Sequence, residues 1–159
     1  MVDSERWPWV RRCDFVVNYI DYLRMLSLAA LNQFLANHEF TRGPGFHVIA
    51  SADGACELQI PYRPEHDRPD GIVGGFVLMR AADVAFWLAI KTRHGLEAEF
   101  VTSSMTSQFL SPARAAGFVC SARLIKSGRR IVYGEATCIA GDRALSHHVL
   151  TFVPVAPAA

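Results

Sequence analysis

The sequence lacks the features that are typical of proteins that bind nucleic acid, hold a metal ion or are exported. Its 159 residues carry 16 basic and 15 acidic side chains, so the net charge of +1 gives no reason to expect nucleic acid as a partner. Cys13, Cys56, Cys120 and Cys138 stand far apart with no CxxC pair, which argues against a zinc site and a disulfide framework. The N-terminus has acidic residues and tryptophans where a secretory signal has a basic patch, so we expect a cytoplasmic protein.

Length and composition predict one compact domain. Of the 159 residues, 51 % are hydrophobic and 19 % are charged, which is enough apolar side chain to form a core without disulfides or a metal. The sequence also contains no internal repeat and no low-complexity segment. A single globular unit is therefore the expectation.

A nearly unbroken apolar run from Gly71 to Ile90 contains only two charged residues, Arg80 and Asp83. The run is as long as a membrane span, but each charge near its centre would add about 2.5–3.5 kcal/mol to insertion. The Gly74–Gly75 pair is instead typical of a turn that leads into a buried helix, so we expect no membrane association. On a helix Arg80 and Asp83 are neighbours, so Asp83 is either paired with Arg80 or kept for chemistry.

Hydrophobic spacing predicts two helices and six strands. Apolar residues three and four apart predict an N-terminal helix within Cys13–His38, and the glycines and proline of Thr41–Phe46 end it. The apolar run predicts a second helix that ends near His94. Alternating patterns predict strands at Phe46–Ser51, Ala55–Tyr62, Glu99–Leu110, Ala116–Lys126, Ile131–Ala140 and Ala144–Val153. Because short turns separate the last four strands, we expect three successive antiparallel hairpins.

These elements predict an α+β protein in which one antiparallel six-stranded sheet wraps around the long central helix. A helix that is apolar almost all round must be covered, and a strongly twisted sheet can do this. The apolar surface that remains would be covered by a second copy of the chain, so we expect a homodimer or a homotetramer. Residues 46–155 would form the main domain and residues 1–45 a helical extension.

Three motifs in this domain resemble those of the hotdog-fold acyl-CoA thioesterases of the phenylacetate-pathway type. They are RPDGIVGG from Arg68 followed by an apolar helix with Ala82-Asp83-Val84-Ala85, then Phe109-Leu110-Ser111-Pro112-Ala113, then RLIKSGRR from Arg123. The resemblance depends on their order and spacing over residues 46–153, since a glycine pair before a helix is a weak signal alone. It implies a hotdog fold, hydrolysis of an acyl-CoA thioester to free acid and CoA, and no cofactor beyond the coenzyme A of the substrate.

The resemblance also implies a catalytic aspartate on the long helix, at the position of Asp83. The family carries a histidine nine residues before this aspartate and an asparagine six residues before the histidine, where this chain has Gly74 and Arg68. Aligning the glycine pairs instead would displace Asp83 by one residue, about 100° around the helix. Thioester hydrolysis needs a base or nucleophile and donors for the oxyanion, which Asp83 and the Gly75 N–H at the helix entrance can supply.

Several residues are candidates for binding the substrate. Those predicted here are Arg68, Gly74, Phe76, Arg80, Trp87, Arg123, Arg129 and Arg130, with Phe86 and Met105 as further residues that can shape the acyl end. The basic residues from Arg123 on surround a predicted turn, where they either face solvent or bind the phosphates of coenzyme A. The aromatic residues either line the pocket or belong to the core. His147 and His148 face opposite sides of a strand, so they cannot jointly bind one metal.

A second class of function is a catalytically inert hotdog domain that binds an acyl-CoA or acyl-carrier ligand. The glycine and arginine that replace the family's histidine and asparagine favour it. A hotdog dehydratase is less consistent with the sequence, because it would need a catalytic histidine at the helix entrance and this chain has none there.

Overall fold

A computed structural model of the chain describes residues 26–155. In chain order the elements are α2 (Leu28–Asn37), α3 (Glu39–Arg42), β1 (His47–Ala52), β2 (Ala55–Ile60), the 3-10 helix η2 (Pro64–His66), α4 (Gly75–His94), β3 (Phe100–Phe109), β4 (Phe118–Ser127), β5 (Val132–Ala140) and β6 (Arg143–Pro154). The predicted helix within Cys13–His38 is present as α2, and its earlier residues lie outside the described range. Ser27 caps α2, since its hydroxyl oxygen accepts a hydrogen bond from the Ala30 N–H at 3.1 Å.

The six strands form one antiparallel sheet in the order β1-β2-β4-β5-β6-β3. The predicted hairpins β4–β5 and β5–β6 are confirmed. The predicted hairpin between β3 and β4 is wrong, because β3 pairs with β6 at the edge of the sheet. The N–H groups of Leu110 and Ser111 both donate to the Leu145 carbonyl, at 2.8 and 3.2 Å, which holds the end of β3 on β6. The chain then crosses through residues 110–117 to β4, which lies beside β2.

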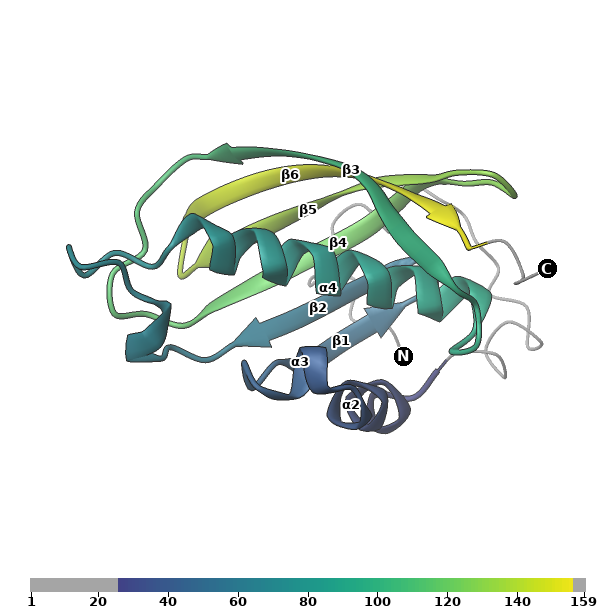
Figure 1. Ribbon diagram of the computed structural model, residues 1–159, viewed down its shortest axis with the longest axis horizontal. Coiled ribbons are helices and arrows are strands. Elements are labelled where there is room, and N and C mark those ends of the chain that lie inside the picture. The colour runs from purple at the N-terminus through teal and green to yellow at the C-terminus, as the bar shows by residue number, and fades with distance from the viewer. Residues whose placement is uncertain (1–25, 156–159) are drawn as a thin grey trace.

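The sheet curves around α4, as predicted (Figure 1). The buried faces of α4 pack on the inner side of the sheet, and the Phe86 ring lies 5.2 Å from the Phe152 ring of β6. The outer face of the helix carries a stripe of side chains three to four residues apart that are exposed or half-buried: Phe76, Met79, Arg80, Asp83 and Trp87. Within residues 26–155, no helix is long and apolar enough to cross a membrane.

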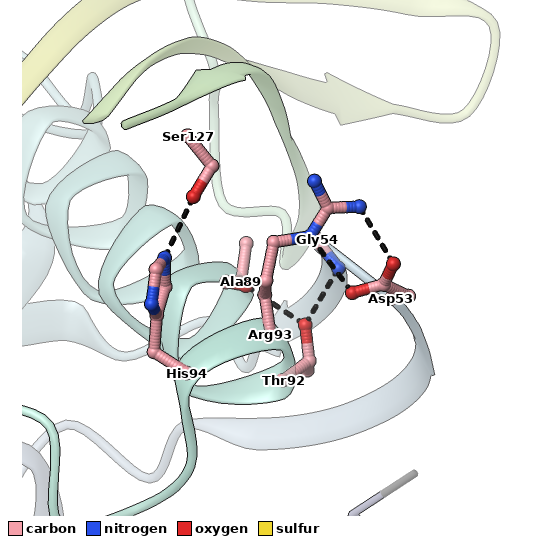
Figure 2. Close-up of polar contacts among 7 residues, drawn as sticks. All are labelled: Asp53, Gly54, Ala89, Thr92, Arg93, His94 and Ser127. Carbon is pink, nitrogen blue, oxygen red and sulfur yellow. Dashed lines mark hydrogen bonds and ion pairs between the residues drawn. The ribbon is translucent and has the colours of Figure 1, made fainter. Parts of the chain in front are cut away.

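Polar contacts fasten the C-terminal end of α4 to the turn between β1 and β2 (Figure 2). Arg93 donates to both carboxylate oxygens of Asp53, at 2.9 and 2.6 Å. The Gly54 N–H donates to the Thr92 hydroxyl at 2.9 Å, and Gly54 adopts the positive φ of +70° that this tight turn requires. These contacts fix the C-terminal end of α4 to the sheet.

Helix α2 covers one of the two edges of the sheet. The Asn32 side chain accepts a hydrogen bond from the Val48 N–H at 2.8 Å and donates to the Val48 carbonyl at 3.0 Å, so it occupies the free edge of β1. Leu31 and Leu35 of the same helix belong to the buried core. The residues before β1 that are described therefore share one core with the sheet. The opposite edge strand, β3, has no such cover within the described residues.

Candidate active site

Two backbone hydrogen bonds set the loop that leads into α4. The Gly74 N–H donates to the His66 carbonyl at 2.8 Å, and the Val73 N–H donates to the Ala113 carbonyl at 2.9 Å. Gly74 is the N-cap and Gly75 the first helical residue. Within residues 26–155 the Gly75 N–H has no hydrogen-bond acceptor. Because it lies at the positive end of the helix dipole, this amide can donate to an oxyanion.

Asp83 lies two turns into α4, where its side chain meets β3. The Thr102 hydroxyl donates to Asp83 Oδ1 at 2.5 Å. Burial raises the pKa of the Asp83 carboxyl above its usual range, and the hydrogen bond from Thr102 acts in the opposite direction. The structure therefore holds a partly buried carboxylate in one orientation while making it a stronger base than a solvated aspartate.

Arg80 does not pair with Asp83, so the ion-pair alternative raised by the sequence is not what the fold forms. The Arg80 guanidinium donates to the Phe40 carbonyl and lies 5.0 Å from the Phe40 ring centre and 5.8 Å from that of Phe46. Within the described residues, Asp83 has no salt-bridge partner. Its charge is therefore not neutralised by the neighbour one turn away.

Two buried polar atoms near the helix entrance have no hydrogen-bond partner in the described part of the chain, Asp67 Oδ1 and Arg80 Nε. Asp67 forms an isolated antiparallel bridge with Val73, so its side chain lies on the same side as that of Val73, which is buried. The other oxygen of Asp67 accepts a hydrogen bond from the Tyr62 hydroxyl at 2.8 Å. An unpartnered buried polar atom is costly, so both atoms are candidates for contact with water or ligand.

Large apolar side chains border the helix entrance. Phe76 is 65 % exposed, Phe109 55 % and Leu110 58 %. A Cβ on Gly75 would lie 3.0 Å from the Phe109 ring, so glycine at this position allows the end of β3 to approach α4 closely. This exposed apolar border around a free amide suits the apolar part of a ligand or a second subunit.

The basic residues predicted to bind substrate do not gather at the helix entrance. Arg68 is exposed and pairs with Asp70 at 3.0 Å. Arg123 pairs with Glu135 on the neighbouring strand at 2.5 Å, with a hydrogen bond from its Nε at 2.7 Å. Both arginines are therefore engaged by carboxylates within the subunit.

Arg129 and Arg130 are exposed in the turn between β4 and β5. His94, the last residue of α4, is 2.6 Å through its Nε2 from the Ser127 hydroxyl, so this turn lies at the C-terminal end of the helix (Figure 2). A helix of 20 residues is about 30 Å long. Within one subunit the two arginines are thus far from Gly75, and only a second copy can bring such a turn to that entrance.

The predicted acyl-pocket residues lie in different surroundings. Trp87 is covered by α2, with its ring 5.0 Å from that of Phe34. Phe86 is fully buried in the core against Phe152. Met105 is half-buried on the inner face of β3, opposite Leu150. Of the three, Met105 is therefore the one beside the open edge of the sheet.

A family model described as the thioesterase superfamily matches residues 71–147, from the loop before α4 into β6. Over these residues the chain is similar to the thioesterase superfamily. A protein of Saccharolobus solfataricus that is provisionally named an esterase is 27 % identical over 88 residues, which are 55 % of this chain and 62 % of that protein. The matched residues thus span less than two thirds of the length of this relative.

Solved structures of thioesterases and related proteins share the fold. A thioesterase of Haemophilus influenzae aligns with a TM-score of 0.74 at 21 % identity, covering 82 % of this chain and 91 % of that chain. A variant of the phenylacetic acid degradation protein PaaI of Thermus thermophilus aligns with a TM-score of 0.68 at 22 % identity, covering 74 % and 100 %. These structures confirm the expected hotdog fold, and the family-model match over residues 71–147 confirms the expected resemblance to thioesterases.

Sequence reasoning missed Thr102 and Asp67 as site residues. Thr102 is one of several hydroxyl residues on a polar strand, and nothing in the local pattern distinguishes it. Asp67 lies in the segment RPEHDRPD, which is typical of a solvated loop. The proline that follows Arg68 and the turn back to Val73 are the only local signals that this loop folds against the helix entrance.

Proposed function

We propose that this protein hydrolyses an acyl-CoA thioester to the free acid and CoA, with Asp83 as the base or nucleophile and the Gly75 N–H as an oxyanion donor. The observation that supports this most is Asp83 itself, a partly buried carboxylate that bonds to Thr102 and has no cationic partner in the described chain. The similarity of residues 71–147 to the thioesterase superfamily supports a thioester as substrate.

The proposed chemistry needs only side chains, backbone amides and water. The Asp83 carboxylate takes a proton from water as the water attacks the thioester carbonyl, or attacks that carbonyl itself. Charge then develops on the carbonyl oxygen, and the Gly75 N–H of a second subunit donates a hydrogen bond to it, since Asp83 and Gly75 of one α4 are about 12 Å apart along the helix. Collapse of this intermediate releases the CoA thiolate, which takes the proton that water gave up. Where Asp83 itself attacked, water then hydrolyses the mixed anhydride to the free acid and restores the carboxylate. Coenzyme A enters as part of the substrate, and no separate cofactor or metal is proposed.

Thiol release from a panel of acyl-CoAs by the full chain tests this function. Turnover above the rate without enzyme supports the hydrolase. Saturable acyl-CoA binding without turnover would instead support the inert acyl-CoA or acyl-carrier binder. The absence of both binding and turnover would contradict both functions.

A cytoplasmic location belongs to the same proposal, and the three free buried cysteines of the described residues suit a reducing compartment.

Replacement of Thr102 by valine tests the electrostatics of Asp83. Burial raises the pKa of the Asp83 carboxyl, and the hydrogen bond from Thr102 lowers it. Thr102→Val removes the lowering contact, so the pKa of Asp83 should rise further, and the acidic limb of the kcat/KM profile should move to higher pH. Thr151→Val, on the neighbouring strand β6 and without a side-chain hydrogen bond among residues 26–155, is the matched control. An unshifted acidic limb in Thr102→Val would contradict a role for Asp83 as the ionised group.

A second copy of the chain is proposed to complete the site through β3. Helix α2 covers the β1 edge of the sheet, whereas β3 is an edge strand with exposed residues along its length and the exposed Phe109 at its end. An uncovered strand of ten residues is a template for pairing with another strand. Pairing of β3 with β3 of a second subunit would place the exposed apolar side chains at the helix entrance of one subunit against the other subunit.

The expected species in light scattering is a dimer or a larger even assembly, with the dimer at about 35 kDa, twice the 17.6 kDa of one chain. The double variant Val101→Lys with Thr106→Lys places charges on the exposed edge and should yield monomers with reduced turnover. Fully active monomers of the unmodified chain would contradict a shared site.

A further inference from the structure

Two side chains that flank Asp83 on α4 both turn toward the segment that contains α2 and α3. Each residue of a helix is rotated by about 100° from the one before, so Arg80 and Trp87 lie about 60° and 40° to the same side of Asp83. The Arg80 guanidinium carbon is 5.0 Å from the centre of the Phe40 ring. The Trp87 ring lies 5.0 Å from the Phe34 ring. The segment thus runs along one flank of α4, past the level of Asp83.

Strand β3 lies on the opposite flank of α4. The Thr102 hydroxyl donates to Asp83 Oδ1 at 2.5 Å, and Met79, one turn before Asp83, is rotated by about 40° to this side. Helix α2 lies at the β1 edge of the sheet, whereas β3 is the strand at the other edge (Figure 1). A thioester carbonyl at Asp83 must therefore lie on the stripe of exposed and half-buried side chains of α4, between these two flanks.

This stripe ends at Trp87. Lys91, one turn further along α4, is 1 % exposed, and its Nζ lies 5.2 Å from the centres of the Phe34 and Trp87 rings. The same Nζ donates to the Leu96 carbonyl at 2.7 Å, which fixes the ammonium group in place. Because the faces of both rings are attracted to this fixed cation, the Trp87 ring is held against α2. The stripe is therefore closed at this end by a rigid aromatic side chain.

An aromatic end of this kind suits the acyl part of a thioester and not coenzyme A. Burial of an apolar chain against rings is favourable, whereas burial of phosphates without cationic partners is costly. The Lys91 ammonium cannot serve as such a partner, because the two rings cover it. With the carbonyl at Asp83, the acyl group therefore points toward Trp87, and the nucleotide part of coenzyme A stays in solvent.

Resting on the proposed thioester hydrolysis, we propose that Trp87 closes the acyl site and that the substrates are acyl-CoA thioesters with short acyl groups. Trp87 contacts the end of the acyl group, and Phe34 is a positioning residue that acts through Trp87.

The helix sets the length of this site. From Asp83 to Trp87 the axis of α4 rises by about 6 Å, the length of roughly five carbon–carbon bonds in an extended chain. An acyl group of up to about six carbons fits this distance, and a longer one meets the Trp87 ring. Helix α2 precedes residues 71–147, the part similar to the thioesterase superfamily, so the support for Trp87 comes from outside the matched region.

Nonhydrolysable 2-oxoalkyl-CoA thioethers test the length limit without requiring turnover, because a methylene separates their carbonyl from sulfur. Calorimetric titration of the full chain should show Kd falling about fourfold for each methylene added, up to about six carbons, since each methylene leaves water. Beyond this length the Kd should fall no further. Affinity that keeps increasing to chains of about twelve carbons, at the same ratio per methylene, would overturn the closed end.

Trp87→Ala should move the limit to longer chains. The Kd of a ten-carbon analogue should fall at least about tenfold, with that of a two-carbon analogue unchanged. Phe34→Ala leaves Trp87 unsupported and should give at least about a threefold fall. Trp87→Phe retains a ring and should keep the limit, and Trp87→Leu, which still packs on Phe34, provides the longer site where alanine lowers the thermal midpoint. Tyr133→Ala, an exposed aromatic residue of β5, is the matched control.

Thiol release from the corresponding acyl-CoAs separates this inference from the proposed function. The kcat/KM values should show the same length limit and the same shift in the variants. A limit that stays at one length in the folded Trp87 and Phe34 variants overturns the closed end while leaving the hydrolysis intact. A binding limit that shifts in a chain that releases no thiol overturns the proposed function while the acyl site stands. Absence of binding by every analogue overturns the acyl site directly.

Discussion

Asp83→Asn is expected to lower kcat/KM for acyl-CoA hydrolysis by about 10²–10⁴-fold, the range typical of losing a positioned base. At 1.36 kcal/mol per tenfold change this corresponds to about 2.7–5.4 kcal/mol of transition-state stabilisation. Asparagine has the same shape and can still accept the Thr102 hydrogen bond, so the change removes the negative charge and the basicity and little else. Thiol release at saturating and limiting acyl-CoA separates the effect on kcat from the effect on KM.

The same variant is expected to fold at least as stably as the unmodified chain at pH 7. A carboxyl whose pKa is raised on folding stabilises the fold below the pKa of the unfolded chain, and this contribution is lost as pH rises through the raised pKa. Burial raises the pKa of Asp83, so at neutral pH its ionised form weakens the fold and its replacement by a neutral amide removes that penalty. Thermal unfolding at a fixed protein concentration checks this expectation.

Asp142→Asn is the matched control, since Asp142 is exposed in the turn between β5 and β6 and forms no side-chain hydrogen bond or ion pair among residues 26–155. It should change neither turnover nor the thermal midpoint. Turnover of Asp83→Asn within twofold of the unmodified chain would remove Asp83 from the mechanism. A marked fall in its thermal midpoint would show instead that the carboxylate serves the fold.

The local elements of this fold were predictable because their signals are local. Alternating hydrophobicity located all six strands to within one or two residues at most ends, and the unbroken apolar run located α4. The same run identified Asp83 as a candidate site residue, because a charged residue within an apolar helix is unusual. Strand order was less accessible: the pairing of β3 with β6 joins residues that are 37 to 54 positions apart, and no turn signal encodes such a contact.

The polar details of the site depended on three-dimensional neighbours that a single sequence does not specify. Arg80 has Asp83 three residues away on the same helix, yet it bonds to the Phe40 carbonyl of α3. Thr102 acquires its role only because β3 runs beside α4 at the level of Asp83. The reactive side chains of a helix can therefore be identified from its sequence. Which groups they bond to depends on how the other elements pack against that helix.

Gly134→Ala is expected to destabilise the protein by about 2–4 kcal/mol, a large effect for the addition of one methyl group. Gly134 lies on β5 in the core, where a Cβ would lie 2.5 Å from the Phe86 ring and closer still to the Arg123 carbonyl of β4. The carbonyl belongs to the sheet backbone and cannot rotate away, so either β4 or α4 must move. Because Phe86 is one turn from Asp83 on α4, turnover should fall with stability.

Gly43→Ala is the matched control for this change. Gly43 has the helical dihedral angles of −61° and −46°, and nothing lies within 4 Å of its Cβ direction. The added methyl group there should be neutral or should stabilise by up to about 1 kcal/mol, because it restricts the unfolded chain without meeting a neighbour. Denaturant midpoints at equal protein concentration compare the stability of the two variants. Equal midpoints would show that β4 and α4 can shift to accommodate a methyl group at Gly134 without loss of stability. A fall confined to Gly134→Ala would show that the close contact of α4 with the sheet holds the helix, and with it Asp83, in place.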